Sequence, residues 1–141
     1  MNVRKKRIEE LTTKLRSKDW DLRYESARIL GDIDKKDLGK DLVTIIQREE
    51  DQQIRKKACD SLGKFHLEIA IPALIDAMQN DRSIVVRYTA ARALGEMKVK
   101  QALEPLKEQL AKEKNLSSIF WFNIALAKIE DDLDGEGIKA L

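Results

Sequence analysis

Three decapeptides decide the fold of this chain: LRYESARILG at 22–31, IRKKACDSLG at 54–63 and VRYTAARALG at 86–95. Arginine, leucine and glycine stand at the same places in each copy, and the copies are equally spaced, with glycines at 31, 63 and 95. A fixed period of about 20 to 50 residues is typical of repeat arrays, in which each unit buries its apolar face against its neighbours. The chain is therefore predicted to be a stack of similar units.

The composition favours helices with a heavily solvated surface. Charged residues make up 37% of the 141 residues and apolar residues 43%, with six glycines and two prolines. The formal net charge is only +2, so no global field would attract a polyanion, and nucleic acid is not implied. Cys59 is the only cysteine, which excludes an intramolecular disulfide and a thiolate zinc cluster and fits a reducing cytoplasm.

The chain carries no apolar stretch near the roughly 20 residues of a membrane span. The basic run at 4–7 is followed by Glu9 and Glu10 and not by the apolar core of a secretory signal. A soluble, cytoplasmic protein without a membrane partner is expected.

Apolar residues at helical spacing predict four helix pairs, over 4–33, 38–65, 71–97 and 103–129, followed by an acidic tail at 131–141. Asp19, Asp51, Ser83 and Asn115 recur with the same period as N-caps of the second helices. The short links force neighbouring helices to be antiparallel, and the pairs must stack. The fold class is all-α, an α-solenoid of eight helices.

Four boundaries rest on single features of the sequence. Pro72 and Pro105 are placed in first helical turns, where a missing N–H costs nothing. The polar stretch 34–40 is read as a link, with the next helix over 41–50. Gly135 and Gly137 predict a frayed tail, unless its apolar residues fold back over the last pair.

The segments IRKKACDSLGKF, VRYTAARALGEM, AIPALIDAM and ALEPLKEQL resemble the short HEAT-like repeats of the phycobilisome-lyase type. The pattern of that family is an Asp-rich turn, V-R-x-x-A-A-x-A-L-G and then A-x-P-A-L, and the resemblance covers about residues 8–130. It implies a superhelix whose second helices line the concave side. The fourth copy departs from the pattern, with Ile119, Asn123 and Ala127 at the Arg, Ala and Gly positions. It is read as a cap or a specialised binding end.

One strip of each second helix is assigned to the scaffold. It holds the repeated arginine, then a small residue such as Cys59, then the repeated glycine, and small residues let neighbouring helices approach closely. Each arginine is expected to pair with an acidic or capping residue of an adjacent turn, such as Asp51 or Asp81, although a row of arginines could also bind anions. The arginines are Arg23, Arg55 and Arg87.

A second strip varies between copies and is the candidate partner-binding face. By resemblance it faces the concave side, and it is enriched in Tyr, Trp and Arg, which anchor interfaces. The predicted partner-binding residues are Tyr24, Arg28, Lys56, Lys57, Asp60, Tyr88, Thr89, Arg92, Phe120, Trp121 and Ile124. The same strip holds Glu25, Asp32, Lys64, Glu96 and Lys128. Taken singly, Glu25, Lys64 or Thr89 is read as part of a solvated helix face.

The run Phe120-Trp121-Phe122 spans about 200° of a helix, so its three rings cannot all face one core. At least one ring should be exposed, or covered by the tail or by another chain. The protein is accordingly expected to be a monomer or a weak homodimer through this aromatic helix.

Three functions are compatible with the sequence. The favoured one is a non-catalytic scaffold that binds another protein through the concave strip. The resemblance also permits a lyase or isomerase acting on a bilin, and some HEAT-like proteins bind nucleic acid, although the six basic residues of the strip are offset by acidic ones. No catalytic residue or cofactor is predicted, and His66, the only histidine, excludes a histidine-ligated metal centre by count.

Overall fold

The computed structural model describes residue 10 and residues 35–140, apart from the side chains of 35–37 and 136–140. Over residues 35–140 the chain forms six α-helices and two single-turn 3₁₀ helices, with no strand, which confirms the predicted all-α solenoid. The first predicted pair, 4–33, lies outside the described residues apart from residue 10. The elements are α3 (Lys35–Arg48), α4 (Gln52–Phe65), η1 (Glu68–Ala70), α5 (Ile71–Asn80), α6 (Ile84–Glu96), η2 (Lys100–Ala102), α7 (Leu103–Leu110) and α8 (Leu116–Ala140).

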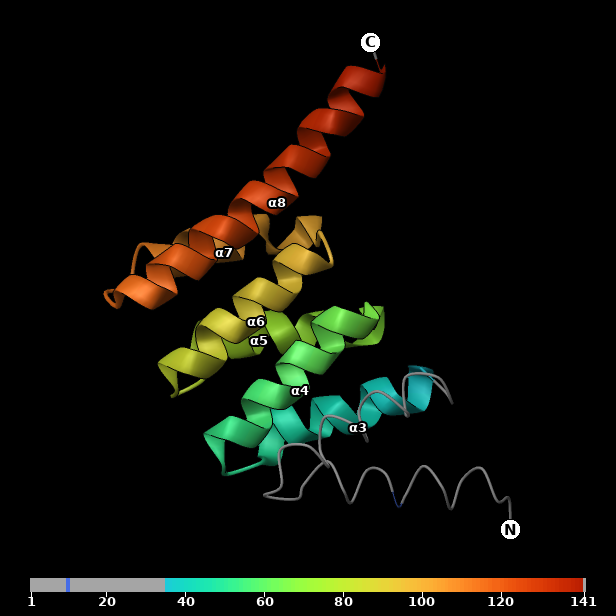
Figure 1. Ribbon diagram of the computed structural model, residues 1–141, viewed down its shortest axis with the longest axis vertical. Helices are drawn as coiled ribbons and strands as arrows, with labels where there is room; N and C mark the ends of the chain where they lie inside the picture. The colour runs from blue at the N-terminus through green and yellow to red at the C-terminus, as the bar shows by residue number, and fades with distance from the viewer. Residues whose placement is uncertain (1–9, 11–34, 141) are drawn as a thin grey trace.

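The helices form two layers. The first helices of the pairs, α3, α5 and α7, pack on one another in one layer, and α4, α6 and α8 pack side by side in the other (Figure 1). Each first helix also packs on its own second helix, so every pair shares its core with the next. This is how an α-solenoid buries apolar faces that a single pair could not cover.

Three of the four predicted N-caps lie in the described part, and all three are confirmed. The Gln53 N–H donates to the Asp51 carboxylate at 2.8 Å, and the Val86 N–H donates to the Ser83 hydroxyl at 3.4 Å. At the start of α8 the Ser118 N–H donates to Asn115 Oδ1 at 3.2 Å. Each cap satisfies an amide that the first helical turn leaves unpaired.

The links between pairs also repeat with the period of the sequence. After α4 and α6 the chain passes through His66 and Lys98, which adopt left-handed backbone conformations with φ of 51° and 53°. In each link the next residue, Leu67 or Val99, is buried and its N–H donates five residues back, to Leu62 O or Leu94 O. This is the Schellman motif, in which glycine usually occupies the left-handed position.

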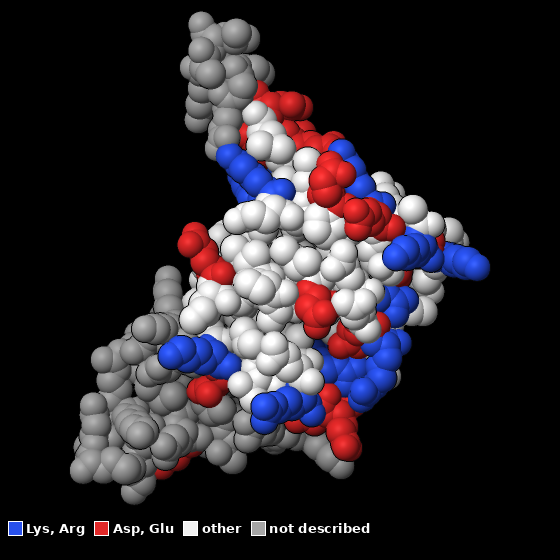
Figure 2. Space-filling view, turned by 180° about the vertical axis from the view of Figure 1, so that it is seen from behind, with Lys and Arg blue, Asp and Glu red and all other residues white. Residues whose placement is uncertain are grey.

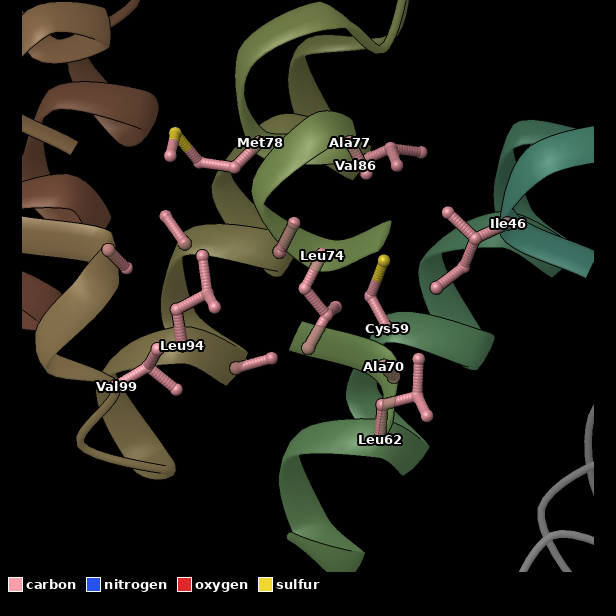
Figure 3. Packing of buried hydrophobic residues seen from close by; sticks show 14 of the residues in the cluster. Ile46, Cys59, Leu62, Ala70, Leu74, Ala77, Met78, Val86, Leu94 and Val99 are labelled. Carbon is pink, nitrogen blue, oxygen red and sulfur yellow. The ribbon is translucent and has the colours of Figure 1, made fainter. Parts of the chain in front are cut away.

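A continuous apolar core runs between the two layers (Figure 3). Leu62, Leu74, Met78 and Leu94 are fully buried within it. Cys59 is also fully buried, and this burial raises the pKa of its thiol far above the ordinary value. As predicted, the cysteine is a core residue, since a protonated buried thiol is a poor nucleophile.

Two predicted boundaries are wrong. The stretch 34–40 is not a link, because α3 begins at Lys35, and fully buried Leu38 extends its apolar stripe by one turn. The tail is neither a separate segment nor folded back, because α8 continues through Gly135 to Ala140 (Figure 1). Leu133 packs on the core, which supports the helix past the predicted end at 129.

Candidate functional site

Ion pairs join successive repeats at the arginine positions. Arg55 Nε and Nη2 donate to the two carboxylate oxygens of Asp81 at 2.9 and 3.0 Å, and the Arg55 side chain is only 4% exposed. Arg87 donates in the same way to Glu113, at the equivalent place in the next repeat. Two parallel N–H···O bonds hold both partners in a fixed orientation. The structural interpretation of these two arginines is confirmed, and neither contributes to a free anion-binding row.

Glu113 is the centre of a larger buried network. Its carboxylate also accepts from Gln109 Nε2 and from the Ser118 hydroxyl, each at 2.7 Å. Burial alone would raise the pKa of Glu113, but the hydrogen bonds from Arg87, Gln109 and Ser118 outweigh it and hold the pKa below its ordinary value. The carboxylate is therefore ionised and fully bonded at neutral pH, which fixes α6, α7 and α8 to one another.

The repeated glycines form the second link between repeats. A Cβ atom at Gly63 would lie 2.8 Å from Ala93 Cα, and one at Gly95 would lie 2.7 Å from Ala125 Cα. Both distances are well inside van der Waals contact between carbon atoms, about 3.5–4.0 Å. The glycines thus permit the close approach of α4 to α6 and of α6 to α8, as the sequence predicts. The repeated arginines and glycines hold neighbouring repeats together, and none of them belongs to the variable strip.

We call the variable strip on α4, α6 and α8 the second-helix face. It comprises Lys56, Lys57, Asp60, Lys64, Tyr88, Arg92, Glu96, Phe120, Trp121, Ile124 and Lys128. All of these side chains are at least partly exposed. Tyr24 and Arg28, which were predicted to belong to it, lie outside the described residues.

One predicted binding residue is misplaced. Thr89 is only 1% exposed, and its hydroxyl donates to Val85 O at 2.7 Å within α6. Because this hydrogen bond satisfies the hydroxyl, the side chain can be buried without a partner. Thr89 is therefore part of the core, and the prediction that it contacts a partner is corrected.

Aromatic and apolar side chains gather at the α8 end of the second-helix face. Phe122 is fully buried, whereas Phe120 is 56% exposed, so the expected division of the three rings is confirmed. The Phe120 and Trp121 rings meet edge to face with centroids 5.2 Å apart, and the Arg92 guanidinium lies 5.0 Å from the centroid of the Trp121 ring. The tail does not cover these rings, since Leu133 lies more than three helical turns, or about 18 Å, further along the helix.

Charged side chains surround a cavity of about 580 Å³ at the α4 end of the face. Its described lining includes Lys57, Asp60 and Lys64 of α4 and Arg92 and Glu96 of α6. Burial raises the pKa of Asp60 above its ordinary value, although the positive charges of Arg92, Lys56 and Lys57 act to lower it. The cavity thus combines a partly desolvated carboxylate with charged side chains of both signs, an arrangement often found at binding sites.

The geometry and the repeated sequence agree with a comparison against protein-family profiles. The profile described as HEAT repeats matches residues 8–90 and 40–126, which together span most of the chain. The chain belongs to the HEAT repeat family. Proteins with HEAT repeats commonly act as protein-interaction scaffolds, and the family is generally non-enzymatic. No curated protein sequence matches this HEAT repeat chain.

Neither a membrane span nor a metal site is found in residues 35–140 of this HEAT repeat protein. None of the helices there is long and apolar enough to cross a membrane. No group of three or more His, Cys, Asp or Glu side chains in the described part is arranged to hold a metal ion. The side opposite the second-helix face carries charges of both signs around an uncharged central area (Figure 2).

Two exposed residues that adjoin the second-helix face were not predicted from the sequence. Ile84 at the start of α6 is 39% exposed, and Leu116 at the start of α8 is 82% exposed. They stand one repeat period apart, and each lies one helical turn before an aromatic residue of the face, Tyr88 or Phe120. Both lie three residues before the repeated arginine position and so outside the decapeptide motif; two large apolar residues one period apart at helix starts are the signal that points to them.

Proposed function

We propose that this HEAT repeat protein is a non-catalytic scaffold that binds another protein through its second-helix face. The proposal rests on one observation: the face ends in a group of accessible rings, Tyr88, Phe120 and Trp121, with Arg92 over the Trp121 ring. Tyr, Trp and Arg dominate binding energy at protein interfaces, especially where they form a cluster. In HEAT superhelices the second helices line the concave side, which suits an elongated partner.

The test is capture of a partner from source lysate by wild type and by the Tyr88→Ala/Trp121→Ala double variant. A Glu108→Ala variant on the exposed side of α7 serves as the control for a surface change elsewhere. We expect the double variant to lose the partner, the control to retain it, and both to keep wild-type helicity by circular dichroism. Capture that survives in the double variant would overturn the assignment of the face.

Self-association is measured first, by light scattering, because the same rings could join two copies. We propose a monomer or a weak homodimer through the aromatic end of α8. A dimer mass that the double variant reduces to a monomer would identify the rings as a contact between copies. The search for a partner would then turn to the α4 end of the face.

We also propose that the repeats are of the phycobilisome-lyase type, which the motif V-R-x-x-A-A-x-A-L-G supports. A cytoplasmic location is proposed as well, supported by the single buried cysteine. A lyase would transfer a bilin to an acceptor apoprotein. If visible absorbance moved to the apoprotein when the chain is incubated with bilin and apoprotein, the protein would be an enzyme and not a scaffold. A steep fall of duplex DNA binding with salt would instead favour nucleic-acid binding.

A further inference from the structure

One side of α8 faces away from the rest of the stack. The helix lies at one edge of the second layer (Figure 1), and in the described part it packs mainly on α6 and α7. Four exposed residues follow one another along the opposite side at helical spacing, within about 60° around the helix axis. We call them the edge strip: Leu116, Phe120, Asn123 and Ala127.

A further HEAT unit does not fit this strip well. Asn123 and Ala127 stand one repeat period after Ala91 and Gly95, which are both buried in α6. Ala127 has the Cβ atom that Gly95 lacks, and Ile119 stands at the arginine position. A second helix packed here would therefore find neither the ion pair nor the close approach that joins the other repeats.

The strip is nevertheless apolar at its start. Leu116 is 82% exposed and Phe120 is 56% exposed, which are the highest values among the large apolar side chains of the described part. The two residues are neighbours on one face of the helix at i and i+4. Repeat arrays normally present polar residues where no further repeat covers them. An apolar pair at such a place indicates a surface that another molecule covers.

Opposite charges lie beyond the two ends of the edge strip. Lys112 and Lys114 are exposed in the turn that precedes α8, and neither forms an ion pair with another described residue. Asp131 and Asp134 are exposed about four helical turns or more past Leu116, and they form none either. The strip thus begins beside free cations and ends beside free anions, so an antiparallel copy of it would be complementary in charge.

Building on the proposed self-association, we infer that the edge strip binds the same strip of a second copy, with the two α8 helices antiparallel. The alignment that sets Leu116 against Ala127 of the second copy also sets Phe120 against Asn123, because both pairs of residue numbers add up to the same value. Each large side chain then meets a smaller one, as in close helix packing. A two-fold axis repeats every contact.

Charge determines the direction of the two helices. In the same alignment Lys112 comes level with Asp131 of the second copy, and this contact also occurs twice. Parallel helices would instead bring lysine to lysine and aspartate to aspartate, which is unfavourable. The contact between two single helices is small beside the roughly 1,600 Å² of a standard interface, so we expect a weak dimer.

The dimer leaves most of the second-helix face free. Trp121 points about 130° away from the edge strip around α8, and Arg92 and Tyr88 lie on α6. Of the residues proposed to bind another protein, Phe120 alone belongs to both surfaces. Binding of a protein partner and pairing of two copies are therefore separable by mutation.

Sedimentation equilibrium of the purified full chain over a range of concentrations tests the contact. We expect wild type to show a monomer–dimer equilibrium and Leu116→Lys/Phe120→Lys to remain a monomer. Tyr88→Ala/Trp121→Ala should still dimerise, as should Asp76→Lys, a charge reversal on exposed α5. Circular dichroism checks that each variant keeps its helicity.

The alignment is tested by reversing charges at Lys112 and Asp131. Lys112→Asp and Asp131→Lys should each raise the dissociation constant roughly tenfold or more, because each places two like-charge contacts in the dimer. Mixed in equal amounts, the two variants should associate as tightly as wild type, since both contacts again join a lysine to an aspartate. These substitutions are on exposed side chains outside the strip, so they leave the fold intact.

Each outcome bears on one proposal. Wild type that stays a monomer at millimolar concentration would overturn the dimer, and so would a dimer that survives Leu116→Lys/Phe120→Lys. Charge variants that mixing does not rescue would overturn the antiparallel alignment. Partner capture that survives in Tyr88→Ala/Trp121→Ala would overturn the scaffold face and leave the dimer in place.

Discussion

Gly95 lies where α6 approaches α8 closely, and replacing it by alanine tests the stacking directly. The new Cβ atom would lie 2.7 Å from Ala125 Cα and 2.9 Å from Ala125 Cβ. To reach ordinary contact, α6 and α8 must separate by several tenths of an ångström or more, because the nearest atom is backbone. Overpacking of this kind costs about 1–3 kcal/mol of the free energy of unfolding.

Helix propensity acts in the opposite direction. Alanine is favoured over glycine inside a helix by about 1 kcal/mol, so Gly95→Ala should produce a net loss of up to about 2 kcal/mol. Gly135→Ala in α8 is the matched control, because a Cβ atom there meets nothing within 4 Å. That variant has only the gain in propensity. The two free energies of unfolding should therefore differ by about 1–3 kcal/mol, with Gly95→Ala the lower.

Urea unfolding followed by circular dichroism measures both variants. Gly39→Ala adds an intermediate case, since its Cβ would meet the end of the Ile69 side chain, which is exposed and can turn aside. The expected order of stability is Gly135→Ala, then Gly39→Ala, then Gly95→Ala. If Gly95→Ala were as stable as Gly135→Ala, the glycine would not be required for the approach of α6 to α8, and the account of the stack would be wrong.

Three further predictions concern single side chains. His66→Gly should raise the free energy of unfolding by about 0.5–1 kcal/mol, because a left-handed backbone strains any residue with a Cβ; an unchanged urea midpoint would contradict this. Glu113→Ala should lower it by about 3–5 kcal/mol, since it leaves Arg87 and buried Ser118 without their acceptor, whereas exposed Glu104→Ala should cost less than about 1 kcal/mol. Asp60→Asn should stabilise the fold at neutral pH, with the gain disappearing in acid, as measured by urea midpoints at both pH values.

The sign of the Asp60 prediction follows from linkage. Its native pKa lies above the unfolded one, so the native state binds a proton more readily and loses stability as pH rises through that interval. Above the native pKa the full penalty remains, and asparagine removes it. Glu113 has the opposite sign: its native pKa is lowered, so its contribution is present above the ordinary pKa and is lost as pH falls through the native one. Glu113→Gln should therefore flatten the loss of stability in acid.

Much of the fold could be predicted from the repeat period, because residues that recur at a constant interval take the same structural role in each repeat. The caps Asp51, Ser83 and Asn115 were predictable on that basis, as were the pairing of Arg55 with Asp81 and the close contacts of the glycines. The pairing of Glu113 could also have been predicted, because acidic residues stand one period apart at 49, 81 and 113. The errors fall where the period is weakest, at the start of α3 and at the end of α8. In both places the polar composition led to a wrong boundary, although Leu38 is fully buried and Leu133 is partly buried against the core.

The binding face was less predictable, because a helical wheel gives the direction of a side chain and not what the next repeat places over it. Thr89 and Trp121 occupy equivalent positions one period apart, yet Thr89 is buried and Trp121 is partly exposed. The stacking of Arg92 on Trp121 likewise depends on the spacing of α6 and α8, which is set by Gly95 and Ala125. Exposure on this face is therefore a property of neighbouring pairs, which a single repeat does not encode.

The stacking contacts and the second-helix face occupy different strips of the same helices, and the energies of the two strips differ. Removing one partner of a buried pair such as Arg87 and Glu113 costs several kcal/mol, whereas an exposed pair such as Glu96 and Lys128 contributes about 0–1 kcal/mol. The face can therefore change its residues at little cost to folding while the stack cannot. Loss of binding after a substitution at exposed Arg92 can then be attributed to the face and not to unfolding, whereas partly buried Tyr88 packs on the core, so its substitution needs the helicity control.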